Sequence, residues 1–276
     1  GLGKSHPDIT NSSRRIKKSE LQNCKENGVE LIEIKIGYDG IVLANSKESK
    51  VMNLTRKHLF LALAKNVPEG NKEGGKLIPN PNKKWSDISD QLPNTPIEVL
   101  GPPPTSGTRD AFQELAIEGG CKTFPALKAI KKQDKKKYKA TCRLIREDGP
   151  FIEAGENDNL IVKKLIENPK AFGVFGFSFL LENEDTLQGS IIDKATPTFE
   201  NISSKKYSVS RPLYIYVKLE HINVIPGIKE FLIEFTSLDA WGPEGYLEER
   251  GLIPMSVDER SQFKKNDEQL ISLNKL

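Results

Sequence analysis

The spacing of hydrophobic positions changes repeatedly along this chain, between the period of a helix and that of a strand. Apolar residues three or four positions apart predict helices at 54–65, 109–120, 157–169 and 225–237, a first helix that opens at Arg14 and stops at Gly28, and a last helix from 258 onward. Alternating or β-branched residues predict strands at 8–10, 96–101, 171–181 and 211–218, and two strands within 29–46 that are separated by Tyr38-Asp39-Gly40. Strands and helices alternate throughout, which is typical of the α/β class.

Two extended stretches bracket the middle of the chain. They are IVLANS at 41–46 and YSVSRPLYIYVK at 207–218. If the flanks fold together and the middle folds separately, these stretches are the crossovers, and a cleft between two lobes is a common place for a ligand. We therefore expect a discontinuous first lobe of residues 1–45 and 210–276, a second lobe of residues 46–209, and a ligand cleft between lobes that two hinge strands join.

The stretch LGPPPTSGTRDAF at 100–112 has the composition of an anion-binding loop. Its three prolines keep the backbone extended, and Thr105 and Ser106 are residue types that cap helices. Gly107 lets a ligand approach the backbone without a Cβ in the way. The predicted helix starts near Thr108–Arg109, so free N–H groups, hydroxyls and a guanidinium meet at one place, which suits a phosphate-like anion. The alternative is an ordinary capped helix that follows a stiff turn.

A second stretch, DITNSSRRIKKSEL at 8–21, repeats this logic near the start of the chain. Strand-like residues lead into the capping types Asn11-Ser12-Ser13, and Arg14 and Arg15 then open the predicted helix. A cation at a helix N-terminus opposes the helix dipole by about 0.3–1 kcal/mol, so an arginine there suggests a bound anion. We therefore predict that Ser13 and Arg14 hold the same anion from the first lobe. The alternative is a solvated first turn.

A third helix start, in IEAGENDNLIV at 152–162, offers Asn157 as a further ligand. Capping of the helix by Asn157 is favoured over a ligand contact, although both are open. Glu153 and Glu156 are close enough in sequence to form an acid–base pair, but no nucleophile accompanies them, and surface carboxylates are the more common outcome.

Composition and charge argue against several classes of protein. The 276 residues include 41 Lys and Arg against 38 Asp and Glu, and the resulting net charge of +3 argues against nucleic acid as a partner. The basic cluster KAIKKQDKKKYK at 128–139 is more typical of a solvated surface than of a patch that binds a phosphate backbone. No stretch approaches the roughly 18 apolar residues of a membrane-spanning helix.

The three cysteines and three histidines lack the spacing of a metal site. No C-x-x-C motif occurs, and the histidines (His6, His58 and His221) lie far apart in the sequence. Two of the cysteines are 21 residues apart and are able to close a disulfide loop in an oxidising compartment, which leaves one thiol over. We predict no metal and no cofactor.

Catalytic motifs are also lacking. The sequence has no G-x-S-x-G elbow, no H-E-x-x-H and no Walker G-x-x-x-x-G-K-[ST], and SSKK at 203–206 matches S-x-x-K without the companion motifs. We therefore expect that the protein is not an enzyme. The rival hypothesis is a hydrolase of a phosphorylated or ester substrate with Ser106 as nucleophile, and it requires a base within reach of that hydroxyl.

The chain resembles the phosphate-binding proteins of bacterial phosphate ABC transporters in four segments, GPPPTSGTRDAF, NPKAFGVFGFSFL, SRPLYIYVK and GYLEERGLIPM. The resemblance covers essentially the whole chain. It implies a type II periplasmic binding protein, with two α/β lobes, two hinge strands and a dehydrated phosphate held between helix N-termini. It also implies that Ser106, Gly107 and Thr108 contact phosphate from the second lobe and Ser13 from the first.

Two positions depart from the best-known branch of that family. The branch has an arginine four residues before the serine of Ser-Gly-Thr, where this chain has Pro102, and an aspartate just after the first-lobe serine, where this chain has Arg14. The departures imply that Arg14, with Arg109, supplies the positive charge. They also imply loss of the carboxylate that accepts the proton of hydrogen phosphate and repels sulfate, with Asp110 as a candidate substitute. Arsenate, sulfate and organic phosphates therefore stay open as ligands beside inorganic phosphate.

Family members begin with a strand and a loop that nothing here matches, so the resemblance implies that an N-terminal segment of the first lobe is missing. It further implies a disulfide between Cys121 and Cys142, and a Cys24 that has lost its partner. The expected protein is a periplasmic, monomeric receptor that captures inorganic phosphate and delivers it to an ABC transporter permease. A phosphate-scavenging or adhesion protein of the same fold is the alternative.

Overall fold

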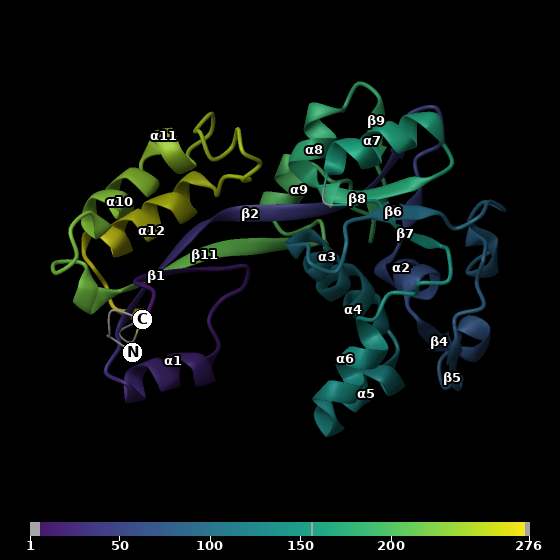
Figure 1. Ribbon diagram of the computed structural model, residues 1–276, viewed down its shortest axis with the longest axis horizontal. Helices are drawn as coiled ribbons and strands as arrows, with labels where there is room; N and C mark the ends of the chain where they lie inside the picture. The colour runs from purple at the N-terminus through teal and green to yellow at the C-terminus, as the bar shows by residue number, and fades with distance from the viewer. Residues whose placement is uncertain (1–5, 156, 274–276) are drawn as a thin grey trace. The chain divides into compact units, whose positions relative to one another are not determined.

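The computed structural model describes residues 6–155 and 157–273. The chain divides into two compact units, of which unit 1 holds residues 1–39 and 211–276 and unit 2 holds residues 40–210 (Figure 1). Strand β2 (Leu31–Ser46) has residues in both units, and β11 (Ser210–Lys218) begins one residue before the second boundary.

Unit 1 is built on three strands in the order β1-β11-β2. β1 (Ile9–Ser12) is antiparallel to β11, with Ile9 opposite Val217 and Ser12 opposite Tyr214. Because side chains alternate between the two faces of a strand, one face of the sheet presents Leu31, Tyr214 and Tyr216 to a core cluster. Residues of the other face, among them Ile32, Ile34, Ile215 and Val217, are fully or almost fully buried.

Helices cover both faces of the sheet in unit 1. α1 (Lys18–Glu26) lies on one face, where Leu21 and Cys24 pack against the core cluster. On the opposite side in Figure 1 lie α10 (Ile228–Phe235), α11 (Leu238–Trp241) and α12 (Val257–Glu268). A 3₁₀ turn, η4 (Leu219–His221), follows β11.

β2 is one continuous strand of 16 residues, so the prediction of two strands separated by Tyr38-Asp39-Gly40 is wrong. Tyr38 is buried and exchanges two backbone hydrogen bonds with Ile253, at N···O distances of 2.8 and 2.9 Å. A little further on, the N–H of Ile41 donates to the carbonyl of Val209 at 2.9 Å. These partners keep the backbone extended through residues that usually form turns.

Unit 2 contains a mixed sheet in the order β2-β8-β6-β7. β6 (Val99–Gly101) is parallel to both of its neighbours, β8 (Phe172–Gly176) and β7 (Phe151–Glu153). β2 is antiparallel to β8 and to the short β9 (Leu187–Gly189). Two small sheets accompany it, β3 (Asn53–Leu54) with β10 (Ile191–Ile192) and β4 (Asn66–Pro68) with β5 (Leu77–Pro79).

The prediction of a strand over 171–181 is correct only as far as Gly176. The next residues form α8 (Phe177–Glu182), in which Phe177 and Leu180 are buried and Leu181 is exposed. Burial at three-residue spacing is that of a helix face, and continuous hydrophobicity alone does not reveal where the strand ends.

The described residues of unit 2 form eight further helical elements. They are α2 (Arg56–Leu63), α3 (Gly107–Phe112), the π-helical η3 (Gln113–Ile117), α4 (Glu118–Cys121), α5 (Pro125–Gln133), α6 (Lys135–Cys142), α7 (Asp158–Glu167) and α9 (Phe199–Ser203). Two 3₁₀ turns, η1 (Glu69–Asn71) and η2 (Trp85–Asp87), lie in the polar excursion that follows α2. α2 packs closely on α4, because a Cβ on Gly120 would lie 1.9 Å from the carbonyl oxygen of Arg56.

A disulfide joins Cys121 of α4 to Cys142 of α6, which confirms the expected pairing, and Cys24 is a free thiol.

Among the described residues, no helix combines the length and apolar character that a membrane crossing requires.

Candidate functional site

The predicted anion-binding loop of unit 2 lies where three parallel strands end. β7, β6 and β8 terminate at Glu153, Gly101 and Gly176, and each strand is followed by a helix, namely α7, α3 and α8. In open α/β sheets, ligands bind outside the carboxyl ends of parallel strands. This edge of unit 2 is therefore the place at which a ligand of the loop would bind.

Ser106 is the N-cap of α3, so this helix begins at Gly107, just before the predicted start near Thr108–Arg109. The Ser106 Oγ accepts a hydrogen bond from the N–H of Thr108 at 3.2 Å, and the Ser106 carbonyl accepts the N–H of Asp110 at 3.2 Å. A tight turn precedes the cap, because the Ser106 N–H donates to the carbonyl of Pro103 at 3.0 Å. A serine hydroxyl carries one proton beside its two acceptor sites, so the cap leaves that proton available to an anion.

Gly107 is the first residue of α3 and faces open space. A Cβ placed on Gly107 would meet no atom within 4 Å, and the backbone there is not left-handed. The fold of the loop therefore does not require glycine at this position. Close approach of a ligand to the backbone N–H of Gly107 would explain the glycine, because a side chain would block that approach.

The buried side chain of Arg109 stabilises the loop through hydrogen bonds. Its side chain is 4% exposed, and its Nη1 donates to Oε1 of Glu153 at 2.8 Å and to the carbonyl of Pro102 at 3.2 Å. The guanidinium lies 4.8 Å from the centre of the Phe151 ring. Arg109 thus joins the end of β6 to the end of β7, and much of its charge is balanced by Glu153.

Asn157 caps α7 through its side chain, which accepts the N–H of Asn159 at 3.0 Å. This is the capping role that the sequence favoured, and the exposed amide group of Asn157 lies at the same edge of the sheet. Glu153 pairs with Arg109, and Glu156, its predicted acid–base partner, lies outside the described residues.

The start of α8 is a third helix N-terminus at this edge that the sequence did not predict. Gly176 is its N-cap, and no side chain caps it. The missed signal is the length of the apolar run at 171–181, which exceeds the five or six residues of an ordinary strand.

In unit 1, the loop that carries Ser13 and Arg14 is not the start of a helix, so that part of the prediction is wrong. Ser12 is the last residue of β1, and α1 begins only at Lys18 after Lys17 as its N-cap. Pairing with β11 holds residues 9–12 extended, and the Ser12 Oγ donates to the carbonyl of Arg14 at 2.6 Å within the loop. The exposed Ser13 therefore has no helix N-terminus beside it.

Arg14 binds an anion that belongs to its own chain. Its guanidinium donates to both carboxylate oxygens of Glu20, at 2.9 and 2.8 Å. Glu20 also accepts the N–H of Lys17 at 3.0 Å, as a capping residue in the first turn of α1. The bonds from Arg14 and then from Lys17 lower the pKa of Glu20 to about 2. Because Arg14 lies before the helix and already pairs with Glu20, its charge does not indicate a bound anion.

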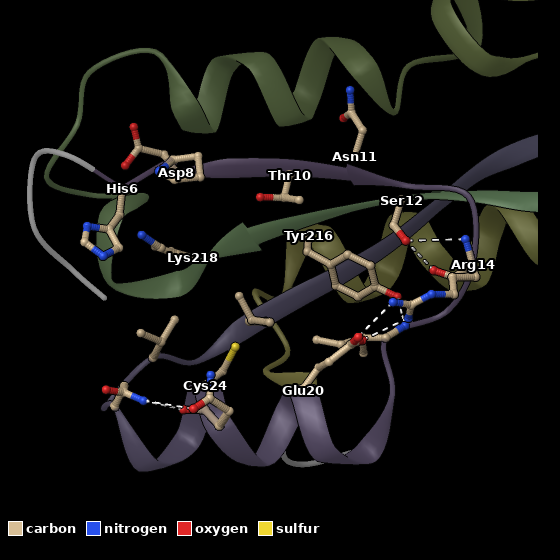
Figure 2. Close-up of a pocket in the computed structure, with 16 residues that line it drawn as sticks. His6, Asp8, Thr10, Asn11, Ser12, Arg14, Glu20, Cys24, Tyr216 and Lys218 are labelled. Carbon is tan, nitrogen blue, oxygen red and sulfur yellow. Dashed lines mark hydrogen bonds and ion pairs between the residues drawn. The ribbon is translucent and has the colours of Figure 1, made fainter. Parts of the chain in front are cut away.

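A cavity of about 450 Å³ lies beside this ion pair, within unit 1. Figure 2 shows Arg14 and Glu20 joined at one end of the cavity, with the ring of Tyr216 next to them. Its floor includes apolar side chains of the core cluster, such as Val29 and Leu31, and Ser13 does not line it. Polar and charged side chains make up most of the rest of the lining, among them Thr10, Asn11 and Lys218.

No catalytic arrangement surrounds Ser106 in the described part of the chain. Its hydroxyl bonds to the backbone N–H of Thr108, and neither a histidine nor a carboxylate hydrogen-bonds to it. His58 accepts the N–H of Thr55 at the start of α2, and His221 pairs with Asp8 at 2.6 Å in unit 1. No group of three His, Cys, Asp or Glu among the described residues is arranged to hold a metal ion.

The family of the chain follows from a comparison with protein families. The sequence pattern of a PBP (periplasmic binding protein) superfamily domain matches residues 2–239. The chain belongs to the PBP superfamily. Solved structures support the PBP fold. A "possible phosphate binding protein" from Planctomyces limnophilus superposes with a TM-score of 0.71 at 23% identity, over 96% of this chain and 81% of that one. PstS from Borrelia burgdorferi superposes with a TM-score of 0.59 at 20% identity, over 91% and 80%.

Curated relatives of this PBP include proteins named as phosphate-binding. It is 28% identical to the phosphate-binding protein PstS of Staphylococcus epidermidis over 236 residues, which are 82% of this chain and 59% of the relative. It is 26% identical to protein SphX of Synechococcus elongatus over 216 residues, which are 76% of this chain and 53% of the relative. The chain thus spans a little over half the length of these relatives. The expected fold class, a two-lobed α/β periplasmic binding protein, is confirmed.

Proposed function

We propose that this PBP is the substrate-binding component of a phosphate ABC transporter, a receptor without catalytic activity that captures inorganic phosphate and passes it to a membrane permease. The observation that carries the proposal is the Ser-Gly-Thr sequence at the start of α3, on the edge where β6, β7 and β8 end. The names of the relatives support phosphate as the ligand.

The chemistry of this helix start favours a small oxyanion. Helix geometry leaves the N–H groups of Gly107 and Arg109 without an intrahelical acceptor, and the Ser106 hydroxyl has a proton to donate. The dipole of the helix adds positive potential at the same point. We propose Ser106, Gly107 and Thr108 as the principal ligands.

Other predicted ligands are retained in the proposal with roles that their contacts suggest. In unit 2, Thr105 and Asn157 would contribute side-chain donors, and Arg109 would contribute positive charge from below the loop. In unit 1, Ser13 and Arg14 would contact the same phosphate. For Arg14 this requires an exchange of Glu20 for phosphate, or the sharing of its guanidinium between them.

We further propose that the protein has two lobes, residues 1–45 with 210–276 and residues 46–209. These lobes correspond to units 1 and 2, whose boundaries lie at 39/40 and 210/211, and β2 and β11 supply the hinges. If each lobe holds part of the ligand's hydrogen-bond partners, phosphate favours the closed state. We also propose that the protein works as a monomer in the periplasm, and the disulfide Cys121–Cys142 supports an oxidising compartment.

Titration calorimetry of Ser106→Ala with phosphate tests the proposal. Loss of one hydrogen bond to a charged ligand predicts affinity weaker by about 1.5–3 kcal/mol. Ser237→Ala is a matched control, because Ser237 caps α11 in the same way, with its Oγ accepting the N–H of Ala240 at 3.2 Å. Both substitutions remove a cap and lower the stability by about 1 kcal/mol, but only the first should alter binding.

Equal phosphate affinity in wild type and Ser106→Ala would remove this loop from the site. The best-known branch of the phosphate-binding proteins has an aspartate where this chain has Arg14, and that aspartate discriminates against sulfate. A repeat of the titration with sulfate as competitor measures whether the exposed Asp110, in the first turn of α3, discriminates against sulfate instead.

A further inference from the structure

Helices α5 and α6 form a strongly basic hairpin in unit 2. Residues 128–139 contain seven lysines, all of them exposed, and one carboxylate, that of Asp134. The two helices lie side by side next to α4, at the lower end of unit 2 in Figure 1. Residues 125–142 therefore carry a net charge of +6, whereas the chain as a whole carries +3, so the remainder carries −3.

The base of the hairpin is held firmly on α4. The disulfide ties Cys142 to Cys121, and the buried carboxylate of Glu118 accepts hydrogen bonds or ion pairs from Lys131 at 3.2 Å, from Lys122 at 3.0 Å and from Arg143. Burial alone would raise the pKa of Glu118, but Lys122 and Arg143 outweigh it and lower the pKa to about 2. The lysines thus project from a fixed platform.

Little within the chain neutralises these lysines. Of the seven, only Lys131 lies within ion-pair distance of a carboxylate in the described residues. Lys135, Lys136 and Lys137 occupy the first turn of α6, where the helix dipole disfavours cations. Asp134 is used as the cap of that helix and accepts the N–H of Lys137 at 2.9 Å. Within the described parts of the chain, carboxylates therefore balance little of this concentrated positive charge.

The character of the surface indicates the kind of partner. Every cation in the stretch is a lysine, whose ammonium is a point charge and lacks the planar fork with which arginine forms two hydrogen bonds to one phosphate. Its one aromatic residue, Tyr138, is buried, so no ring is available to stack on bases or to enter a membrane. Lysine ammonium groups spread over the surfaces of two helices suit an extended, negatively charged surface better than a small binding pocket.

We propose that the α5–α6 hairpin docks this protein on the surface of an anionic phospholipid bilayer. Each lysine near such a surface contributes on the order of 1 kcal/mol of attraction, which fades beyond a Debye length of roughly 10 Å at 0.1 M salt. The contact is peripheral and reversible, since no apolar group inserts. It is separate from the phosphate loop and does not depend on it.

Flotation of the full chain with lipid vesicles tests the proposal. Vesicles of phosphatidylcholine with about 30% phosphatidylglycerol are compared with pure phosphatidylcholine, at low salt and at a salt concentration that screens the charges. The test variant is Lys135→Gln, Lys136→Gln, Lys137→Gln, which relieves the dipole conflict and so leaves α6 intact. The control variant is Lys47→Gln, Lys50→Gln, Lys72→Gln, which removes the same charge from exposed positions of unit 2 outside the hairpin.

The wild type and the control variant should bind anionic vesicles at low salt, and the test variant should bind at least about tenfold more weakly. Absence of wild-type binding to anionic vesicles, or an equal loss in both variants, would overturn the proposal. Tighter binding of the hairpin to duplex DNA or to polyglutamate than to the vesicles, under the same conditions, would assign it to a nucleic acid or an acidic protein instead.

Discussion

Two loops of this protein look alike in sequence and differ in structure. Each follows a strand and combines serine with arginine, in TSGTR at 105–109 and in NSSRR at 11–15. In unit 2, the serine caps a helix, and the arginine is buried beneath it in contact with the next strand. In unit 1, the helix begins several residues later, and Arg14 is exposed and paired with Glu20.

The difference shows that capping residues identify a helix start only when the chain is free to turn there. Pairing of residues 9–12 with β11 keeps the backbone extended through Ser12, and α1 begins only at Lys18. It also shows that a cation near a helix start does not by itself indicate a foreign ligand, since Glu20 in the first turn of α1 supplies the negative charge.

The largest expected effect is a difference in folding stability between alanine substitutions of the two arginines. Arg109→Ala removes a buried guanidinium that bonds to Glu153 and Pro102 and stacks on Phe151, and we expect a loss of about 2–4 kcal/mol in the free energy of unfolding. Arg14→Ala removes an exposed pair and should cost less than about 1 kcal/mol. Urea denaturation of both variants measures the difference, and equal costs would contradict the distinction between the loops.

An intermediate effect concerns Gly107. Gly107→Ala should leave the melting temperature unchanged or slightly raised, because its Cβ meets open space. If phosphate approaches the N–H of Gly107, the added methyl should weaken binding about tenfold or more, which corresponds to roughly 1.4 kcal/mol.

Gly176→Ala is the matched control for this substitution. It lies at the start of α8 on the same edge, where a Cβ would make only an ordinary contact with the Ser178 Oγ at 3.7 Å. Calorimetry with phosphate should show no change for this variant. Unchanged affinity in Gly107→Ala would mean that the ligand does not approach that N–H.

The smallest expected effect is the pH dependence of the Arg14–Glu20 pair. The pKa of Glu20 is lowered from 4.5 to about 2, so the pair stabilises the folded protein above pH 4.5 and loses its effect as the pH falls toward 2. Because both side chains are more than 40% exposed, solvent screens the interaction and the contribution stays below about 1 kcal/mol. Glu20→Gln should therefore be slightly less stable than wild type at pH 6 and equally stable at pH 2.

A carboxyl titration of Glu20 by NMR gives a direct check. A midpoint near 4.5 in the folded wild type would show that Arg14 is not committed to Glu20. In that case the guanidinium would be available to an external anion, and the two loops would be more alike than their structures indicate.

Much of the fold was predictable because the hydrophobic pattern records which face of each element is buried. The helix at 54–65 and the strand at 211–218 were recognised in this way, as α2 and β11. The misreading of Tyr38-Asp39-Gly40 as a turn arose because the pairing of β2 with Ile253 and Val209 involves residues more than 160 positions away. Local turn propensity carries no information on such partners.

The candidate site was predictable to the extent that it depends on one short segment. Ser106 as a cap and Gly107 as an open position both follow from local sequence. The partners of the arginines do not, since Glu153 is separated from Arg109 by 44 residues and comes from another strand. Glu20 was visible in the sequence only six residues after Arg14, but its effect depends on where α1 begins.

The continuity of β2 has a consequence for how the protein unfolds. One stretch of backbone supplies Ile32 and Ile34 to one hydrophobic interior and Val42 and Leu43 to another. Melting of either interior withdraws support from the strand that the other uses, so the two halves should lose structure in a single cooperative event. Two fragments produced by dividing the chain after residue 39 would each contain only part of β2, so neither should fold stably alone.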